Sequence, residues 1–170
     1  SRFPIREKAF WQHDDLASAQ GHMRVVIEID GRQLALYNLH IVHPGMAGGF
    51  SAAQRAKDVG YILARAAAES GPVLLVGDFN MSDQSDDYNH VRAVYGDAYR
   101  AVGWGLGLTF PDWTTEAGRE FGRAIQTMTP LLVRLDYAFY NTYLRPLNAY
   151  VAGTSAGSDH RPLWVRFTWQ

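Results

Sequence analysis

The sequence predicts an α/β fold, a sandwich organised around a mixed β-sheet. The predicted strands outnumber the predicted helices, and the first clear pair of strands forms an antiparallel hairpin, which favours a mixed sheet over a doubly wound parallel one. The 170 residues are 47% hydrophobic and 19% charged, which is enough apolar material for a buried core. We therefore expect one domain over residues 1–170.

The first predicted elements are two strands. Residues 24–29 are rich in β-branched side chains and are followed by the turn dipeptide Asp30-Gly31. A second run over residues 33–39 alternates in polarity and breaks at Pro44-Gly45. Two such runs on either side of a short Asp-Gly connection are typical of a β-hairpin.

A helix is predicted to follow the hairpin. Ser51 and Gln54 fit a capping box, in which their side chains would bind free backbone N–H groups. Apolar side chains then recur at helical spacing until Gly71-Pro72 ends the helix. The apolar stripe consists of Val59, Ile62, Leu63 and Ala66.

The rest of the chain alternates apolar strands with less regular segments. Residues 73–76 are all apolar, as in a strand that is covered on both faces. Residues 85–102 are expected to form helix and loop, and the glycine- and aromatic-rich residues 103–129 to be mostly irregular surface. Three further strands are predicted at residues 135–139, 144–151 and 163–168.

Composition excludes several classes of protein. The absence of cysteine excludes disulfide scaffolds, thiolate zinc sites and thiol catalysis. The net charge of -1 gives no overall signature of nucleic-acid binding. No apolar run reaches the roughly 18 residues of a membrane span, and residues 1–5 lack the apolar segment of a signal peptide.

Polar side chains stand at the ends of two predicted strands. Asn38 and His40 are two residues apart at the end of one strand, so both side chains point to the same face. Asp78 and Asn80 follow residues 73–76 with the same spacing. Each also has a structural interpretation, because Asp78 can form a turn, Asn38 can bind neighbouring backbone and His40 can be a half-buried core histidine.

Two further polar positions lie near the last strands. Asp136 directly follows Arg134-Leu135, and Asp159-His160 occupies a loop before the final strand. As structural alternatives, Asp159 can cap a turn, and Asp136 can pair with Arg134 or Arg145 in a surface salt bridge worth at most about 1 kcal/mol. Taken together, these groups at strand ends indicate one sheet rim suited to metal binding and proton transfer.

The order of these residues resembles that of the endonuclease/exonuclease/phosphatase family. The resemblance spans the chain and also includes the first five residues, which are similar to the Ser-Arg-Tyr-Pro strand of that family. The matching motifs are Ser1-Arg2-Phe3-Pro4-Ile5, Asn38-Leu39-His40, Gly77-Asp78-Phe79-Asn80, Arg134-Leu135-Asp136-Tyr137 and Ser158-Asp159-His160-Arg161-Pro162.

The resemblance implies metal-dependent hydrolysis of a phosphate ester, with Mg²⁺ or Mn²⁺ as cofactor and a nucleic acid, a lipid or a small phosphoester as substrate. Asp159 would bind the metal, directly or through water, together with Asp78. Asp78 would also orient or deprotonate the attacking water, and Asn80 would hold this water or a phosphate oxygen.

The resemblance also implies roles for the remaining residues. His160 would contact the phosphate or act as a base, and His40 would donate to a phosphate oxygen or protonate the leaving group. Asp136 would fix the tautomer of one of these two histidines. Asn38 and Arg134 are further expected substrate-binding residues.

One departure from the family pattern concerns the metal. Family members place an Asn and a metal-binding Glu upstream of the segment that residues 1–5 resemble, and Glu7 and Glu28 do not stand in the right place to replace that Glu. We therefore expect the chain to be the C-terminal portion of a longer domain, with the missing N-terminal segment as a partner. The alternative is a catalytically impaired binding module that keeps the fold without the metal-binding Glu.

Two segments, residues 44–50 and 103–129, are expected to choose the substrate. The second holds Trp104, Phe110 and Trp113, which would stack on bases, insert at a lipid surface or simply cover the core. Its Gly-Trp-Gly-Leu-Gly run is similar to bacterial members whose full-length chains carry N-terminal membrane spans. This similarity favours a lipid phosphate or a small phosphodiester over duplex DNA.

A zinc-dependent hydrolase that uses His40, His43 and His160 is a further interpretation. The His-Ile-Val-His spacing of the first two matches no zinc-protease motif, which ranks this alternative last.

Overall fold

The computed structural model of the chain describes residues 1–13, 16, 21–43, 45, 51–124 and 133–170, except the side chains of residues 121–124. One sheet has six strands in the order β1-β2-β3-β4-β6-β5, and a second sheet pairs β7 with β8. The strands of the first sheet are β1 (Ile5–Trp11), β2 (His22–Ile29), β3 (Arg32–His40), β4 (Val73–Asp78), β5 (Gly96–Asp97) and β6 (Asp136–Tyr140). The other elements are β7 (Leu144–Val151), β8 (Leu163–Trp169), α1 (Ala52–Ala67), α2 (Asp86–Arg92), α3 (Ala98–Val102) and α4 (Glu116–Ala124).

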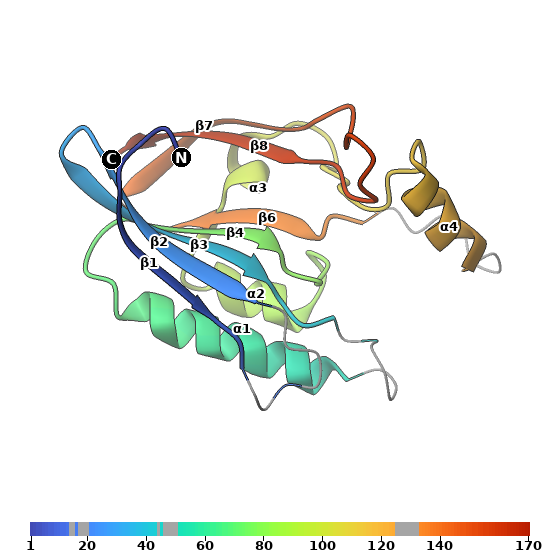
Figure 1. Cartoon of the computed structure of the whole chain (residues 1–170), viewed down its shortest axis with the longest axis horizontal. Helices are drawn as coiled ribbons and strands as arrows, with labels where there is room; N and C mark the ends of the chain where they lie inside the picture. Colours follow the sequence, from blue (N-terminus) through green and yellow to red (C-terminus); the bar gives the residue numbers. More distant parts are fainter. Residues whose placement is uncertain (14–15, 17–20, 44, 46–50, 125–132) are drawn as a thin grey trace.

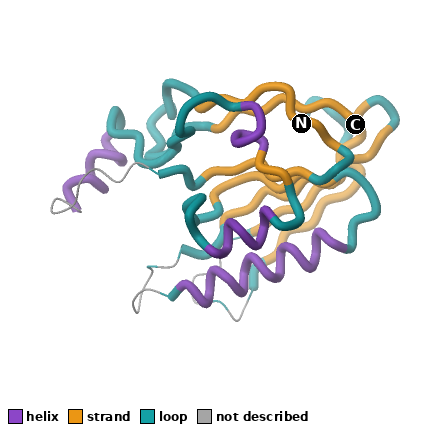
Figure 2. The backbone as a smooth tube through the Cα atoms, turned by 180° about the vertical axis from the view of Figure 1, so that it is seen from behind, coloured by secondary structure: helices purple, strands orange, loops and turns teal. Residues whose placement is uncertain are grey.

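The elements form a layered sandwich. Helices α1 and α2 lie along one face of the six-stranded sheet, and the β7–β8 sheet lies over the other (Figure 1, and from behind in Figure 2). Strands β3 and β4 are parallel, whereas β1–β2, β2–β3 and β4–β6 are antiparallel. The predicted mixed-sheet α/β sandwich is therefore confirmed.

Each face of the six-stranded sheet has its own apolar core. Tyr37 and Leu75 pack with Ile62 of α1 on the helical side. Leu74 packs with Leu144 on the side of the second sheet. Because successive residues of β4 enter different cores, the run 73–76 is covered on both faces, as predicted. Full burial of each large side chain contributes roughly 1.5–3 kcal/mol.

Strand β1 is an element that the sequence pattern did not predict. Most of its residues are exposed, so it lacks the apolar alternation that identifies a strand. Arg6 pairs with Glu28 at 2.9 Å, and Glu7 pairs with Arg24 at 2.8 Å. These charges line the outer strand of the sheet, where they oppose pairing with another chain. Glu7 and Glu28 therefore each belong to a surface ion pair with an arginine.

Two details of the helices differ from the predictions. Helix α4 lies within residues 103–129, which were expected to be mostly irregular, because a run of Glu, Ala and Arg favours helix despite two glycines. Ser51 is the N-cap of α1, as predicted, but its side chain makes no capping hydrogen bond. The prediction that the Ser51 hydroxyl binds a free backbone N–H group of the helix is therefore wrong.

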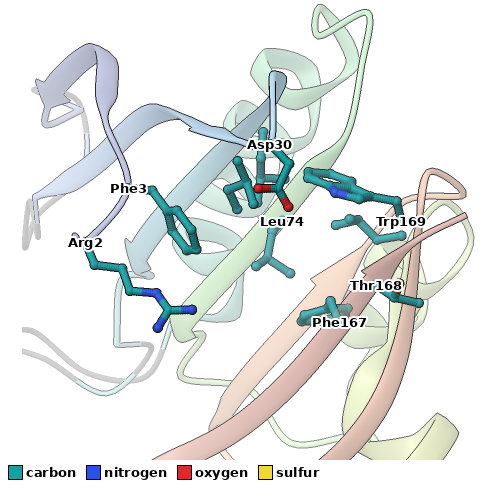
Figure 3. Close-up of a pocket in the computed structure, with 10 residues that line it drawn as sticks. Arg2, Phe3, Asp30, Leu74, Phe167, Thr168 and Trp169 are labelled. Atoms are coloured by element: carbon teal, nitrogen blue, oxygen red, sulfur yellow. The ribbon is translucent and has the colours of Figure 1, made fainter.

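A cavity of about 440 Å³ opens at the hairpin-turn end of the sheet (Figure 3). Its walls carry Phe3, Leu74, Phe167 and Trp169, with one carboxylate from Asp30. It lies at the opposite end of β3 from His40 and gathers no set of catalytic groups. Among the described residues, no helix combines the length and apolar character needed to cross a bilayer.

Candidate active site

Strand pairing sets three of the predicted site residues in one row. His40, the last residue of β3, pairs with Asp78, the last residue of β4, and Asp78 pairs with Asp136, the first residue of β6. Because directly paired residues project to the same face of a sheet, an imidazole and two carboxylates lie side by side.

His160 joins this row from the loop before β8. Its Nδ1 lies 2.8 Å from Oδ2 of Asp136. Its Nε2 lies 3.9 Å from Oδ2 of Asp78, and Nε2 of His40 lies 3.7 Å from the same oxygen. One carboxylate oxygen of Asp78 is thus flanked by two imidazoles. The structure also shows that Asp136 orients His160 rather than His40.

The loop after β4 holds the second oxygen of Asp78. The backbone N–H of Asn80 donates to Oδ1 of Asp78 at 2.8 Å, so Oδ2 is the oxygen that faces the histidines. Asn80 adopts φ +47, and its side-chain Nδ2 donates to the carbonyl of Ile41 at 2.8 Å. Asn80 is buried and ties the ends of β3 and β4 together at the site.

Gly77 allows β4 to approach β3 at this point. Its φ is +127, a conformation that L side chains rarely adopt, and a Cβ atom there would lie 2.0 Å from the carbonyl oxygen of Leu39. The glycine of the Gly-Asp-Phe-Asn motif is therefore required by the backbone that positions Asp78.

The environment shifts the pKa values of two groups. Burial raises the pKa of Asp78, and the nearby charge of Asp136 acts in the same direction. For His160, burial opposes the charged form, but the hydrogen bond to Asp136 and the charges of Asp136, Asp78 and Asp159 outweigh it and raise the pKa. The site therefore stabilises the protonated form both of the Asp78 carboxyl and of the His160 imidazole.

Thr109 positions Asp136, a role that the sequence did not indicate. Its hydroxyl accepts hydrogen bonds from the backbone N–H groups of Leu135 at 3.1 Å and Asp136 at 3.2 Å. Thr109 is fully buried. A hydroxyl that binds a backbone group 27 residues away leaves no local pattern in the sequence.

The segment from Thr109 to Asp112 also binds the loop that carries His160. The carbonyl of Thr109 accepts from the N–H of Arg161 at 2.8 Å, and the N–H of Asp112 donates to the carbonyl of Asp159 at 2.7 Å. The Arg161 guanidinium also binds the buried Asp112 carboxylate at 3.0 Å. Residues on either side of His160 are thereby fixed.

Asn38 and Asp159 border the row. Asn38 is exposed on β3 and shares with Asp136 the lining of a cavity of about 360 Å³. Asp159 is half-buried, and its charge raises the pKa of the adjacent His160. Within the described part of the chain, its carboxylate makes no hydrogen bond.

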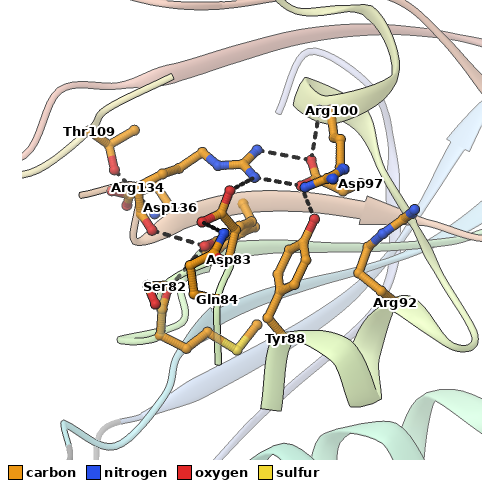
Figure 4. Close-up of polar contacts among 12 residues, drawn as sticks. Ser82, Asp83, Gln84, Tyr88, Arg92, Asp97, Arg100, Thr109, Arg134 and Asp136 are labelled. Atoms are coloured by element: carbon orange, nitrogen blue, oxygen red, sulfur yellow. Dashed lines mark hydrogen bonds and ion pairs between the residues drawn. The ribbon is translucent and has the colours of Figure 1, made fainter. Parts of the chain in front are cut away.

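Arg134 is the predicted site residue that the structure does not bring to the row. Its guanidinium is buried and bound to Asp97, at 3.2 Å from Oδ1 and 2.9 Å from Oδ2 (Figure 4). It also lies over the ring of Tyr137. Asp136 pairs with His160, not with Arg134 or Arg145. Arg134 thus stabilises the scaffold behind the site.

The aromatic residues of the segment 103–129 have different environments. The ring of Phe110 lies 4.6 Å from that of His160, so it packs directly on the site. Trp104 is 94% exposed and Leu106 is 78% exposed, whereas Trp113 is half-buried. The other expected specificity segment, residues 44–50, lies outside the described residues except for Gly45.

The three-histidine zinc site is not formed. Nδ1 of His43 accepts a hydrogen bond from the N–H of Gly45, and His43 does not share a metal-ligand group with His40 and His160 in the described parts of the chain. Their ligand atoms are too far apart, so this alternative is wrong.

Comparison with known proteins identifies the family. Residues 1–160 match the model of the Endonuclease/Exonuclease/phosphatase family. The chain belongs to this family. Members of the endonuclease/exonuclease/phosphatase family are hydrolases that act on phosphoesters, which agrees with the acidic and imidazole groups at the rim. No curated protein matches the sequence.

Solved structures of the family share the fold. A conserved protein of unknown function from Enterococcus faecalis V583 aligns with a TM-score of 0.77 and 17% identity, covering 98% of this chain and 67% of that one. The mannosyl-6-phosphatase Bt3783 of Bacteroides thetaiotaomicron aligns at 0.72 and 18% identity, covering 98% and 67%. The catalytic domain of human Nocturnin aligns at 0.64 and 19% identity, covering 99% and 60%. The upstream segment with a further metal ligand stays a prediction.

Proposed function

We propose that this chain is a divalent-metal-dependent phosphoesterase whose site consists of His40, Asp78, Asp136 and His160, with Asn80 and Asp159 beside them. The observation that carries the proposal is the contact geometry of Asp78. One of its oxygens is fixed by a backbone N–H, and the other lies 3.7 and 3.9 Å from two imidazole nitrogens.

The donor groups of the site suit a hard divalent cation. Asp78 and Asp159 offer carboxylate oxygens, and the Asp159 carboxylate is half-buried with no hydrogen bond in the described part of the chain. Mg²⁺ keeps several waters when it binds to proteins, so one or two carboxylates suffice. When bound there, Mg²⁺ or Mn²⁺ would neutralise charge on the phosphate and the leaving oxygen.

The protein groups divide the proton chemistry. Asp78 orients the attacking water and accepts its proton at Oδ2, because Oδ1 already accepts the backbone N–H of Asn80. Asp136 accepts a hydrogen bond from the Nδ1–H of His160, which leaves the Nε2 side of His160 for a phosphate oxygen. His40, whose side chain is 47% exposed, donates to the leaving group.

Hydrolysis of bis(p-nitrophenyl) phosphate tests this proposal. The wild-type chain should be active with Mg²⁺ and inactive with EDTA, and Asp78→Asn should lower kcat/KM by about 10²–10⁴-fold because the base is lost. Asp86→Asn, which changes an exposed carboxylate on α2, is the matched control. Full activity of Asp78→Asn would contradict the proposal. Binding of the ester by the wild-type chain without hydrolysis would favour the binding module.

We further propose a lipid phosphate or a small phosphoester as the substrate. The net charge of -1 gives no attraction to duplex DNA. Trp104 and Leu106 are exposed, as are the apolar side chains with which proteins insert into a membrane interface. A panel of nicked plasmid, abasic duplex, inositol phosphates, mannose 6-phosphate, sphingomyelin and polyprenyl pyrophosphate separates the classes. Trp104→Ala should slow hydrolysis of a vesicle-embedded substrate and leave a soluble one unaffected; equal effects on both would refute insertion.

A further inference from the structure

A second group of titratable side chains lies at the same end of the sheet as the candidate active site, but on other elements. His13 is the second residue after β1, His22 is the first residue of β2, and Asp58 lies in α1. Pairing of Trp11 with His22 brings the ends of β1 and β2 together. The resemblance to the family gave no role to these residues.

The three side chains are close enough to share one ion. Their ligand atoms all lie within 4.8 Å of one another. Nε2 of His22 is 3.0 Å and Nε2 of His13 is 3.8 Å from Oδ1 of Asp58. Tetrahedral zinc with bonds of about 2.0–2.1 Å requires ligand atoms roughly 3.3 Å apart. The observed separations bracket this spacing, so small side-chain rotations complete the site.

Neighbouring groups orient the ligands. The backbone N–H of Val42 donates to Oδ2 of Asp58 at 2.9 Å, which turns Oδ1 toward the two histidines. A hydrogen bond of this kind to a ligating carboxylate is typical of metal sites. The indole N–H of Trp11 donates to Nε2 of His13 at 3.3 Å, so this nitrogen carries no proton, and a metal ion bound there would replace the indole N–H at its lone pair.

Charge gives a reason for a cation at this point. Asp58 and His22 are each 1% exposed. In the part of the chain that the structure describes, the side chains that ion-pair with Asp58 are these two histidines. A buried carboxylate is costly away from water unless a positive charge or hydrogen bonds compensate for it. A cation bound between these three side chains would supply that positive charge.

We propose that His13, His22 and Asp58 form a structural site for a divalent transition-metal ion, with Zn²⁺ as its preferred occupant. Two imidazoles and one carboxylate are the donor set of Zn²⁺ rather than of Mg²⁺, which prefers oxygen ligands alone. The ion would join β1, β2 and α1, and through Asp58 it would fix Val42, two residues after His40. The site is independent of the proposed hydrolysis.

Equilibrium dialysis of the full chain against Zn²⁺, with thermal unfolding in parallel, tests this site. All variants carry His160→Gln, which removes an imidazole of the candidate active site from the count. His90→Gln, an exposed histidine of α2, is the control and should bind one Zn²⁺ and gain thermal stability from it. His13→Gln and His22→Gln should bind at least about tenfold more weakly.

His13 is half-buried, with its side chain 20% exposed, so His13→Gln should fold even if the change at the buried His22 does not. Equal Zn²⁺ affinity in His13→Gln and the control would overturn the proposal. So would a control that binds no Zn²⁺. Because neither measurement uses hydrolysis, loss of the proposed phosphoesterase function would leave this result unaffected.

Discussion

The hydrogen bond between Asp136 and His160 offers the sharpest test of the candidate site. Asp136→Asn keeps the shape of the side chain and its backbone bond to Thr109, so the fold should remain intact. What changes is the partner of Nδ1 at 2.8 Å, which becomes a neutral amide instead of a carboxylate.

The size of the effect follows from the kind of hydrogen bond that is lost. A bond to a charged group is worth about 1.5–3 kcal/mol and a neutral one about 0.5–1.5 kcal/mol, so the substitution removes roughly 1–2 kcal/mol. If this difference is made only in the transition state, kcat/KM falls about 5- to 30-fold. An amide NH₂ turned toward Nδ1 would also reverse the tautomer of His160 and deepen the loss.

The assay is hydrolysis of a bis-aryl phosphate with saturating Mg²⁺, with Asp86→Asn as the matched control. The loss should appear mainly in kcat, since Asp136 acts through His160 and not on the ground-state ester. A kcat/KM within about twofold of the control would refute the view that Asp136 orients a catalytic histidine.

Three further predictions concern the scaffold. Thr109→Val leaves the partly buried N–H groups of Leu135 and Asp136 without their hydroxyl partner and should cost about 1–3 kcal/mol in total, measured by urea unfolding, while Thr109→Ser should be close to wild type. Gly77→Ala should lower both Tm and activity, because its Cβ would lie 2.0 Å from the carbonyl oxygen of Leu39; an unchanged Tm would contradict this. The hydrogen bond from Arg24 lowers the pKa of the Glu69 carboxyl below 4.5. The ion pair therefore stabilises the folded state above pH 4.5, and this contribution is lost as the pH falls through the lowered pKa that Glu69 has in the folded protein. The stability difference between wild type and Glu69→Gln should therefore shrink below pH 4.5, and a constant difference would rule out this linkage.

Local patterns in the sequence were enough to predict most of the scaffold. The hairpin around Asp30-Gly31, the amphipathic helix after Ser51 and the apolar strand at residues 73–76 each depend on neighbours close in sequence, so their periodicity is visible in one dimension. Strand β1 and helix α4 were missed. An edge strand with charged side chains has no apolar alternation, and helix propensity alone is a weak signal.

The sequence by itself also determined which chemical groups stand at strand ends, because residues two apart on a strand share a face. Only the tertiary structure decided their partners. It joined Asp136 to His160, placed Arg134 against Asp97 behind the row, and brought His13 and His22 to Asp58. The partners are far apart in the sequence. Asp136 and His160 are 24 positions apart, and Arg134 and Asp97 are 37 apart. Asp58 is 36 positions from His22 and 45 from His13. Such pairs are set by strand order and by packing of both cores, which no local period records.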